Sequence, residues 1–145
     1  MKKYYAAIGI VAMAAISGCS TTPVTRSQAK VVAPGQILTP EIQRQAGERN
    51  VAVLLIRDAG FMGNSVDAIV AVDGAKLVAL KPGQSFDFYL SAGNHVFSVL
   101  PAGNPLGEPM AENDIEVKAG GNNSFRLRLI SGDEPRIERS SQIDK

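Results

Sequence analysis

The stretch VDAIVAVDGAKLVALKPGQSFDFYL, residues 66–90, decides the fold of this chain. It contains two short apolar runs on either side of Asp73-Gly74, and an Asp-Gly pair in this setting predicts a tight β-hairpin. A second turn follows at residues 81–84, with proline and glycine where a type II turn requires them. Residues 84–90 then alternate apolar and polar side chains, which is typical of a strand with one buried face. The region therefore predicts antiparallel β structure.

The same sequence pattern continues on both sides of this stretch. Short apolar or alternating runs recur roughly every ten residues between glycine-bearing turns. This spacing predicts an all-β domain over residues 50–140, a small antiparallel β-sandwich of seven or eight short strands, rather than a parallel α/β fold. The expected strands are residues 51–57, 66–72, 76–80, 84–90, 95–100, one containing Ile115 and Val117, 125–130 and 136–139. We expect the core to contain Phe86, Phe88, Phe125, Leu127 and Leu129.

The N-terminus has the pattern of a secretory signal. Lys2 and Lys3 precede thirteen uncharged residues, and small residues follow at Ser17 and Gly18. The apolar run is too short for a membrane-spanning helix, which needs roughly 20 residues. Residues 1–18 are therefore expected to be a signal peptide.

Residues 16–19, Ile-Ser-Gly-Cys, resemble the bacterial lipobox, and Cys19 is the only cysteine of the chain. The resemblance implies that Cys19 carries a diacylglycerol and that the signal is cut before it. Several acyl chains would hold the protein stably to a membrane. Because Ser20, and not aspartate, follows the cysteine, the resemblance favours the outer membrane, with the domain facing the periplasm. The alternative is an ordinary signal with an incidental cysteine.

Residues 19–49 read as a flexible tether. Ser, Thr, Pro, Gln and Lys dominate its first half, without hydrophobic periodicity. As a coil it would hold the domain about 30 Å from the bilayer. Thr39, as an N-cap before Pro40, indicates a short helix over residues 40–46. The last residues, 141–145, are expected to be frayed.

The net charge of the chain does not indicate that it binds nucleic acid. Without residues 1–18 and their two lysines, 13 Lys and Arg (15 minus 2) face 14 Asp and Glu. The net charge is then near −1, so a polyanion would find no excess of positive charge. No cofactor is expected. A metal site is also not expected, because His95 is the only histidine and stabilising a turn is its simpler role.

Several motifs from the predicted domain resemble a known family. Arg57, Gly60-Phe61-Met62-Gly63, Val70-Ala71-Val72-Asp73-Gly74, Leu80-Lys81-Pro82-Gly83 and Leu90-Ser91-Ala92-Gly93-Asn94-His95 occur in the order found in the lipoprotein domain of unknown function 2846. That family is similar in style to PEGA-like surface β-sandwiches. The resemblance covers about residues 51–130. It implies a fold and an envelope location, and it brings no catalytic residues.

Catalytic patterns are weak. No Gly-x-Ser-x-Gly elbow is present, and Ser27-Gln28-Ala29-Lys30 matches a bare Ser-x-x-Lys pattern only within the expected tether. Asp114 and Glu116 would share one face of a strand, where a solvated edge explains them more simply than acid–base chemistry. We therefore expect a protein that is not an enzyme, with a small hydrolase as the least favoured function.

Two features indicate contact with a partner. Phe61 and Met62, bracketed by glycines, would place large apolar groups in a loop, where they either meet a partner or plug the open end of the sandwich. Arg126 and Arg128 share the outward face of one strand. They either hold an acidic group of a partner or glycan, or pair with Glu112, Asp114 and Glu116 on a neighbouring strand.

These observations lead to two expected functions. The first is a non-catalytic, lipid-anchored envelope lipoprotein that presents a β-sandwich binding module to a protein or envelope polymer. The second is a structural accessory subunit of an envelope assembly. In both, Cys19 joins the chain to the membrane.

Overall fold

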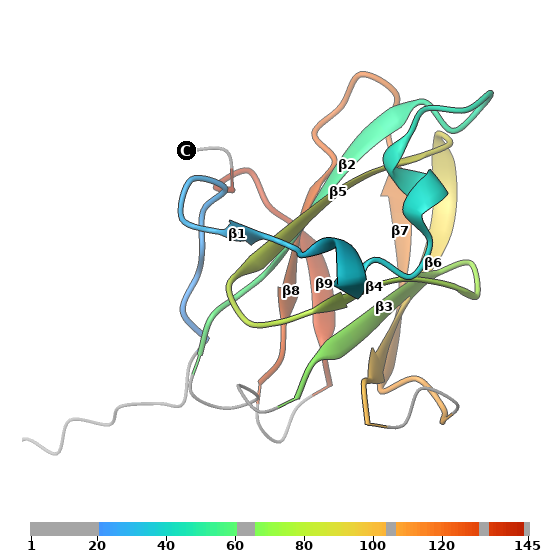
Figure 1. Ribbon diagram of the computed structural model, residues 1–145. Helices are drawn as coiled ribbons and strands as arrows, with labels where there is room; N and C mark the ends of the chain where they lie inside the picture. Colours follow the sequence, from blue (N-terminus) through green and yellow to red (C-terminus); the bar gives the residue numbers. More distant parts are fainter. Residues whose placement is uncertain (1–20, 61–65, 104–106, 131–133, 144–145) are drawn as a thin grey trace, which may run out of the picture.

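A computed structural model describes residues 21–60, 66–103, 107–130 and 134–143, and in them two β-sheets pack face to face (Figure 1). The five-stranded sheet has the order β1-β5-β2-β8-β9, and the four-stranded sheet has the order β4-β3-β6-β7. The predicted small all-β sandwich is thereby confirmed. The strands are β1 (Lys30–Val31), β2 (Val51–Arg57), β3 (Ala68–Val72), β4 (Ala75–Leu80), β5 (Gln84–Leu90), β6 (Gly93–Pro101), β7 (Ala111–Val117), β8 (Ser124–Arg128) and β9 (Arg136–Arg139).

The turns around β4 form as their residues predict. Asp73 and Gly74 have φ angles of 50° and 82°. A type I′ hairpin turn requires positive φ at both central positions, and it joins β3 to β4 here. Gly83 has a φ of 74°, as the third residue of a type II turn requires. This second turn leads the chain from β4 in one sheet to β5 in the other.

The core lies between the two sheets and is rich in phenylalanine. Phe86 and Phe88 stack with their ring centroids 5.1 Å apart, and Phe88 meets Phe97 at 6.4 Å. Phe125 and Leu127 are also buried in this core, and Leu129 packs against it while partly buried. The predicted core residues therefore come together. Among the described residues, no helix has the length and apolar character needed to cross a membrane.

Eight of the nine strands were expected, but the pairing is more varied than a purely antiparallel sandwich. β2 pairs parallel to β8, and β1 pairs parallel to β5. β2 is central and buried on both faces from Val53 onward, as its continuous aliphatic run predicts. Its two neighbours come from distant parts of the chain, so local patterns could not give their direction.

The flexible tether predicted over residues 19–49 is wrong for the part that the structure describes. Residues 21–32, called the N-terminal strap here, begin on the outer face of the five-stranded sheet and end at its edge, where β1 pairs with β5 (Figure 1, blue). Within it Val24 is buried against Leu54 and Ile56, and Val32 reaches the main core. Val24 and Val32 are thus packing residues, whereas Val31 between them is 72 % exposed.

Two smaller predictions near the ends of the domain are also corrected. The helix expected over residues 40–46 is a 3-10 helix over Pro40–Gln43, after another at Pro34–Gln36. Thr39 does not cap it, because its hydroxyl donates to the Lys76 carbonyl. The tail is not frayed at Ile143, which is fully buried and whose carbonyl accepts the Arg26 N–H.

Candidate functional site

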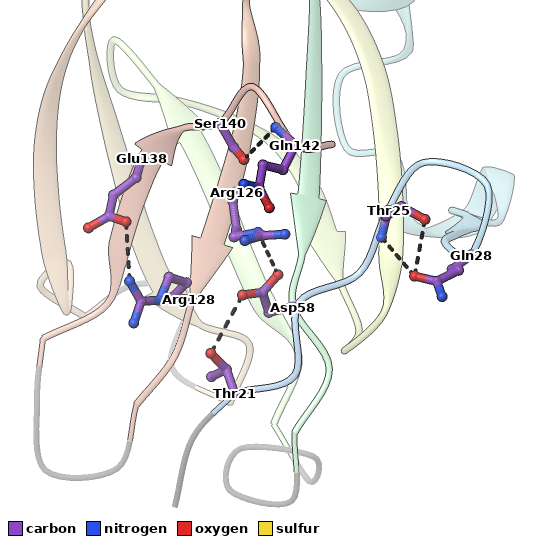
Figure 2. Close-up of polar contacts among 9 residues, drawn as sticks. All are labelled: Thr21, Thr25, Gln28, Asp58, Arg126, Arg128, Glu138, Ser140 and Gln142. Carbon is purple, nitrogen blue, oxygen red and sulfur yellow. Dashed lines mark hydrogen bonds and ion pairs between the residues drawn. The ribbon is translucent and has the colours of Figure 1, made fainter. Parts of the chain in front are cut away.

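A polar hollow of about 290 Å³ lies on the outer face of the five-stranded sheet, beside the start of the N-terminal strap. We call it the arginine hollow. The residues that matter for its chemistry are Thr21, Asp58, Arg126, Arg128, Glu138 and Arg139. They come from the strap, the residue after β2, and strands β8 and β9; Figure 2 shows all of them except Arg139.

An ion pair forms the floor of the hollow. The Nε of Arg126 lies 3.0 Å from Oδ1 of Asp58, and the Asp58 side chain is only 1 % exposed. The two atoms attract as charges but lack the alignment of a hydrogen bond. Asp58 stands here because its N–H continues the β2–β8 ladder by donating to the Leu127 carbonyl. The end of the central strand thus fixes this carboxylate under β8.

Asp58 also holds the N-terminal strap. Its Oδ2 accepts a long hydrogen bond of 3.5 Å from the Thr21 hydroxyl (Figure 2). Burial raises the pKa of Asp58 above its usual value, while the charge of Arg126 and a hydrogen bond from the Val24 backbone act in the opposite direction. The carboxylate is therefore placed at an energetic cost, and its contacts join the strap to β8.

The other two arginines of the hollow are bound by residues of β8, β9 and the neighbouring turn and strand. Arg128 pairs with Glu138 on β9 at 3.2 Å, and both side chains are well exposed. Arg139 lies over the ring of Phe125, and its guanidinium donates to Asn123 at 3.2 Å and to the Glu116 carbonyl. The expected pairing of Arg126 and Arg128 with Glu112, Asp114 and Glu116 is wrong, since β7 belongs to the other sheet.

The arrangement suits a small anionic group. Three arginines and two carboxylates leave one net positive charge around the hollow. Among the described residues, Nη1 and Nη2 of Arg126 make no hydrogen bond, so two donor groups remain for a ligand. A guanidinium that uses only Nε for its protein partner can still bind a carboxylate or phosphate.

His95 has the structural role expected of it. Its Nδ1 lies 2.6 Å from Oδ2 of Asp73, and its Nε2 lies 2.9 Å from the Ser91 carbonyl. Burial alone would raise the pKa of Asp73, but hydrogen bonds from His95 and the Val96 N–H bring it below its usual value. The contacts join the β3–β4 turn to β6. In the described part of the chain, no cluster of three His, Cys, Asp or Glu side chains could hold a metal ion.

The sequence prediction and the structure overlap only in part at this site. Arg126 and Arg128 lie on one outward face, as predicted, and they line the same hollow. Asp58 was not singled out, although it is the second of two charged residues that follow the aliphatic run of β2. Phe61 and Met62, and also Cys19, lie outside the described residues.

Comparison with known proteins gives no match, either to a family model, to a curated protein or to a solved structure. The resemblance to the domain of unknown function 2846 therefore stays a prediction.

Proposed function

We propose that this protein is a non-catalytic, lipid-anchored lipoprotein of a bacterial cell envelope, which presents its β-sandwich to a protein or envelope polymer. Cys19 carries the lipid, and the domain faces the periplasm from the outer membrane. The arginine hollow holds an acidic group of the partner, through Arg126 and Arg128. The observation that carries the proposal is the position of this hollow, whose wall includes Thr21, two residues after Cys19.

The short connection also supports the second function, a structural accessory subunit. Because the strap is packed on the sandwich from Thr21 onward, a lipidated Cys19 would leave the domain no long tether with which to search. Its partner must then be at the membrane surface. A subunit of an assembly in that membrane meets this condition as well as a general binder does.

The anchor is tested first. Cys19→Ala should leave an unprocessed precursor that takes up no labelled palmitate, because the thioether acceptor is gone. Ser20→Ala is the matched control and should be labelled like the wild type. Palmitate labelling that survives Cys19→Ala would contradict the anchor.

Partner capture is tested in the same membranes by cross-linking and pull-down. Arg128→Gln should reduce capture while changing the melting temperature little, because Arg128 and Glu138 form an exposed pair. The control is Arg44→Gln, an exposed arginine away from the hollow. One stoichiometric partner identifies a subunit, and several weak partners identify a general binder. Capture that is unchanged in Arg128→Gln contradicts the role of the hollow.

A further inference from the structure

The chain between the proposed lipid and the folded domain is a single residue. Two Cα steps lead from Cys19 to Thr21, and an extended chain covers about 7 Å in that distance. The strap is fixed at its first described residues, because Thr22 and Ala59 exchange backbone hydrogen bonds of 2.6 and 3.0 Å. Thr21 also lies against Gly60, where an added methyl group would meet the Thr21 Cα at 3.4 Å. A lipid on Cys19 would therefore lie close to the end of β2.

Several strands end or begin on this side of the sandwich, which we call the anchor-side end. β2 ends here, and Ala68 at the start of β3 pairs with Leu80 and Pro101 at the ends of β4 and β6. The turn at Lys81–Gly83 also belongs to it, since the Gly83 N–H donates to the Arg57 carbonyl. In Figure 1 these segments lie at the lower side of the sandwich. The hairpin turn of β3 and β4 lies at the opposite end.

The described part of the anchor-side end exposes apolar side chains. Val66 is 41 % exposed and Met110 is 36 % exposed. The Arg57 guanidinium donates a hydrogen bond of 2.9 Å to the Val66 carbonyl, and the Met110 N–H donates to the Val99 carbonyl. Its exposed charges are of both signs, with Lys81 and Arg136 against Glu108 and Glu134. A surface with this character can rest on lipid headgroups by position and apolar contact, without an excess of positive charge.

We infer that the anchor-side end of the sandwich rests on the bilayer, with Val66 and Met110 at the headgroup region. The inference rests on the proposed lipidation of Cys19. The far end, with Asp73, Ala92 and Ala119, then points into the aqueous compartment. The arginine hollow stands at the side, near the membrane surface, where a membrane-associated partner can reach it.

The orientation can be measured on the full lipidated protein in vesicles of phosphatidylethanolamine and phosphatidylglycerol. Once Cys19 is acylated, an introduced cysteine is the only free thiol and takes a fluorophore. We would label Val66→Cys and Met110→Cys at the anchor-side end, and Ala92→Cys and Ala119→Cys at the far end. All four sites are exposed, so the fold should tolerate the changes. Headgroup-quencher lipids should reduce the fluorescence at 66 and 110 and leave 92 and 119 unchanged.

A lengthened connection is the matched control. Inserting about 20 Gly and Ser residues between Ser20 and Thr21 would give the domain a reach of about 25 Å, and quenching at 66 and 110 should then fall. Equal quenching at both ends, in protein whose intact mass shows the lipid, overturns the orientation but leaves the anchor in place. An intact mass without lipid overturns the anchor and the orientation together.

Discussion

Phe88→Ala should lower the free energy of unfolding by about 3–5 kcal/mol, as truncation of a buried phenylalanine usually does. Phe88 is 1 % exposed and lies between the rings of Phe86 and Phe97. Removing its ring leaves a cavity in a core to which both sheets contribute, and the flanking aromatic contacts are lost. Urea denaturation measures this loss, and the m value, the slope of the unfolding free energy against urea concentration, should not change.

The neighbouring residue on the same strand supplies the control. Asp87 faces outward and pairs with Arg26, and both side chains are more than half exposed. Asp87→Ala should therefore cost less than about 1 kcal/mol. Comparable losses for Phe88→Ala and Asp87→Ala would show that the inward and outward faces of β5 are wrongly assigned.

Arg57→Ala should also cost about 3–5 kcal/mol, because it removes packing and takes the side-chain donor from the buried Leu80 carbonyl and the part-buried Val66 carbonyl. Arg57 follows Val53 and Leu55 on the inward face of β2 and is only 2 % exposed. Its Nη1 donates to the Leu80 carbonyl at 2.6 Å and to the Val66 carbonyl at 2.9 Å. Burial lowers its pKa to about 10, with the charge of Asp67 opposing the shift, so the side chain stays charged at neutral pH.

These contacts join the end of β2 in one sheet to the end of β4 in the other. Arg57→Met keeps much of the side-chain volume and should recover part of the loss, which separates packing from hydrogen bonding. Arg128→Ala removes an exposed arginine of the same sheet and should cost less than about 1 kcal/mol. If Arg57→Ala lowers the free energy of unfolding no more than Arg128→Ala does, Arg57 does not join the two sheets at the anchor-side end.

The strands could be predicted because their signals are local. The Asp73-Gly74 turn, the proline and glycine at residues 82 and 83, and the alternation through β5 each act within a few residues. The matching elements form within one or two residues of the expected bounds for β2 to β5. The phenylalanine core follows from the same alternation, because residues two apart on a strand share a face.

The site and the strap could not be predicted so well, because their contacts join distant segments. Val32 is held by the Ser85 carbonyl, and Asp58 by Arg126, so neither role is encoded nearby in the sequence. The ion-pair partner of Arg128 could be predicted only by knowing which strand lies beside β8. That neighbour is β9, which supplies Glu138, whereas the preceding strand β7 lies in the other sheet.

The central claim is that the chain is folded onto the sandwich from its first described residues, so that any lipid on Cys19 lies next to the domain. Hydrogen exchange of the strap amides in the mature chain tests this claim most directly. The amides concerned belong to Thr22, Arg26, Ala29, Lys30 and Val32, and their acceptors lie 2.6 to 3.1 Å away. We expect these amides to exchange far more slowly than those of a free chain, because the strap must open first. Exchange at the free-chain rate throughout residues 21–32 would contradict the account and restore a flexible tether.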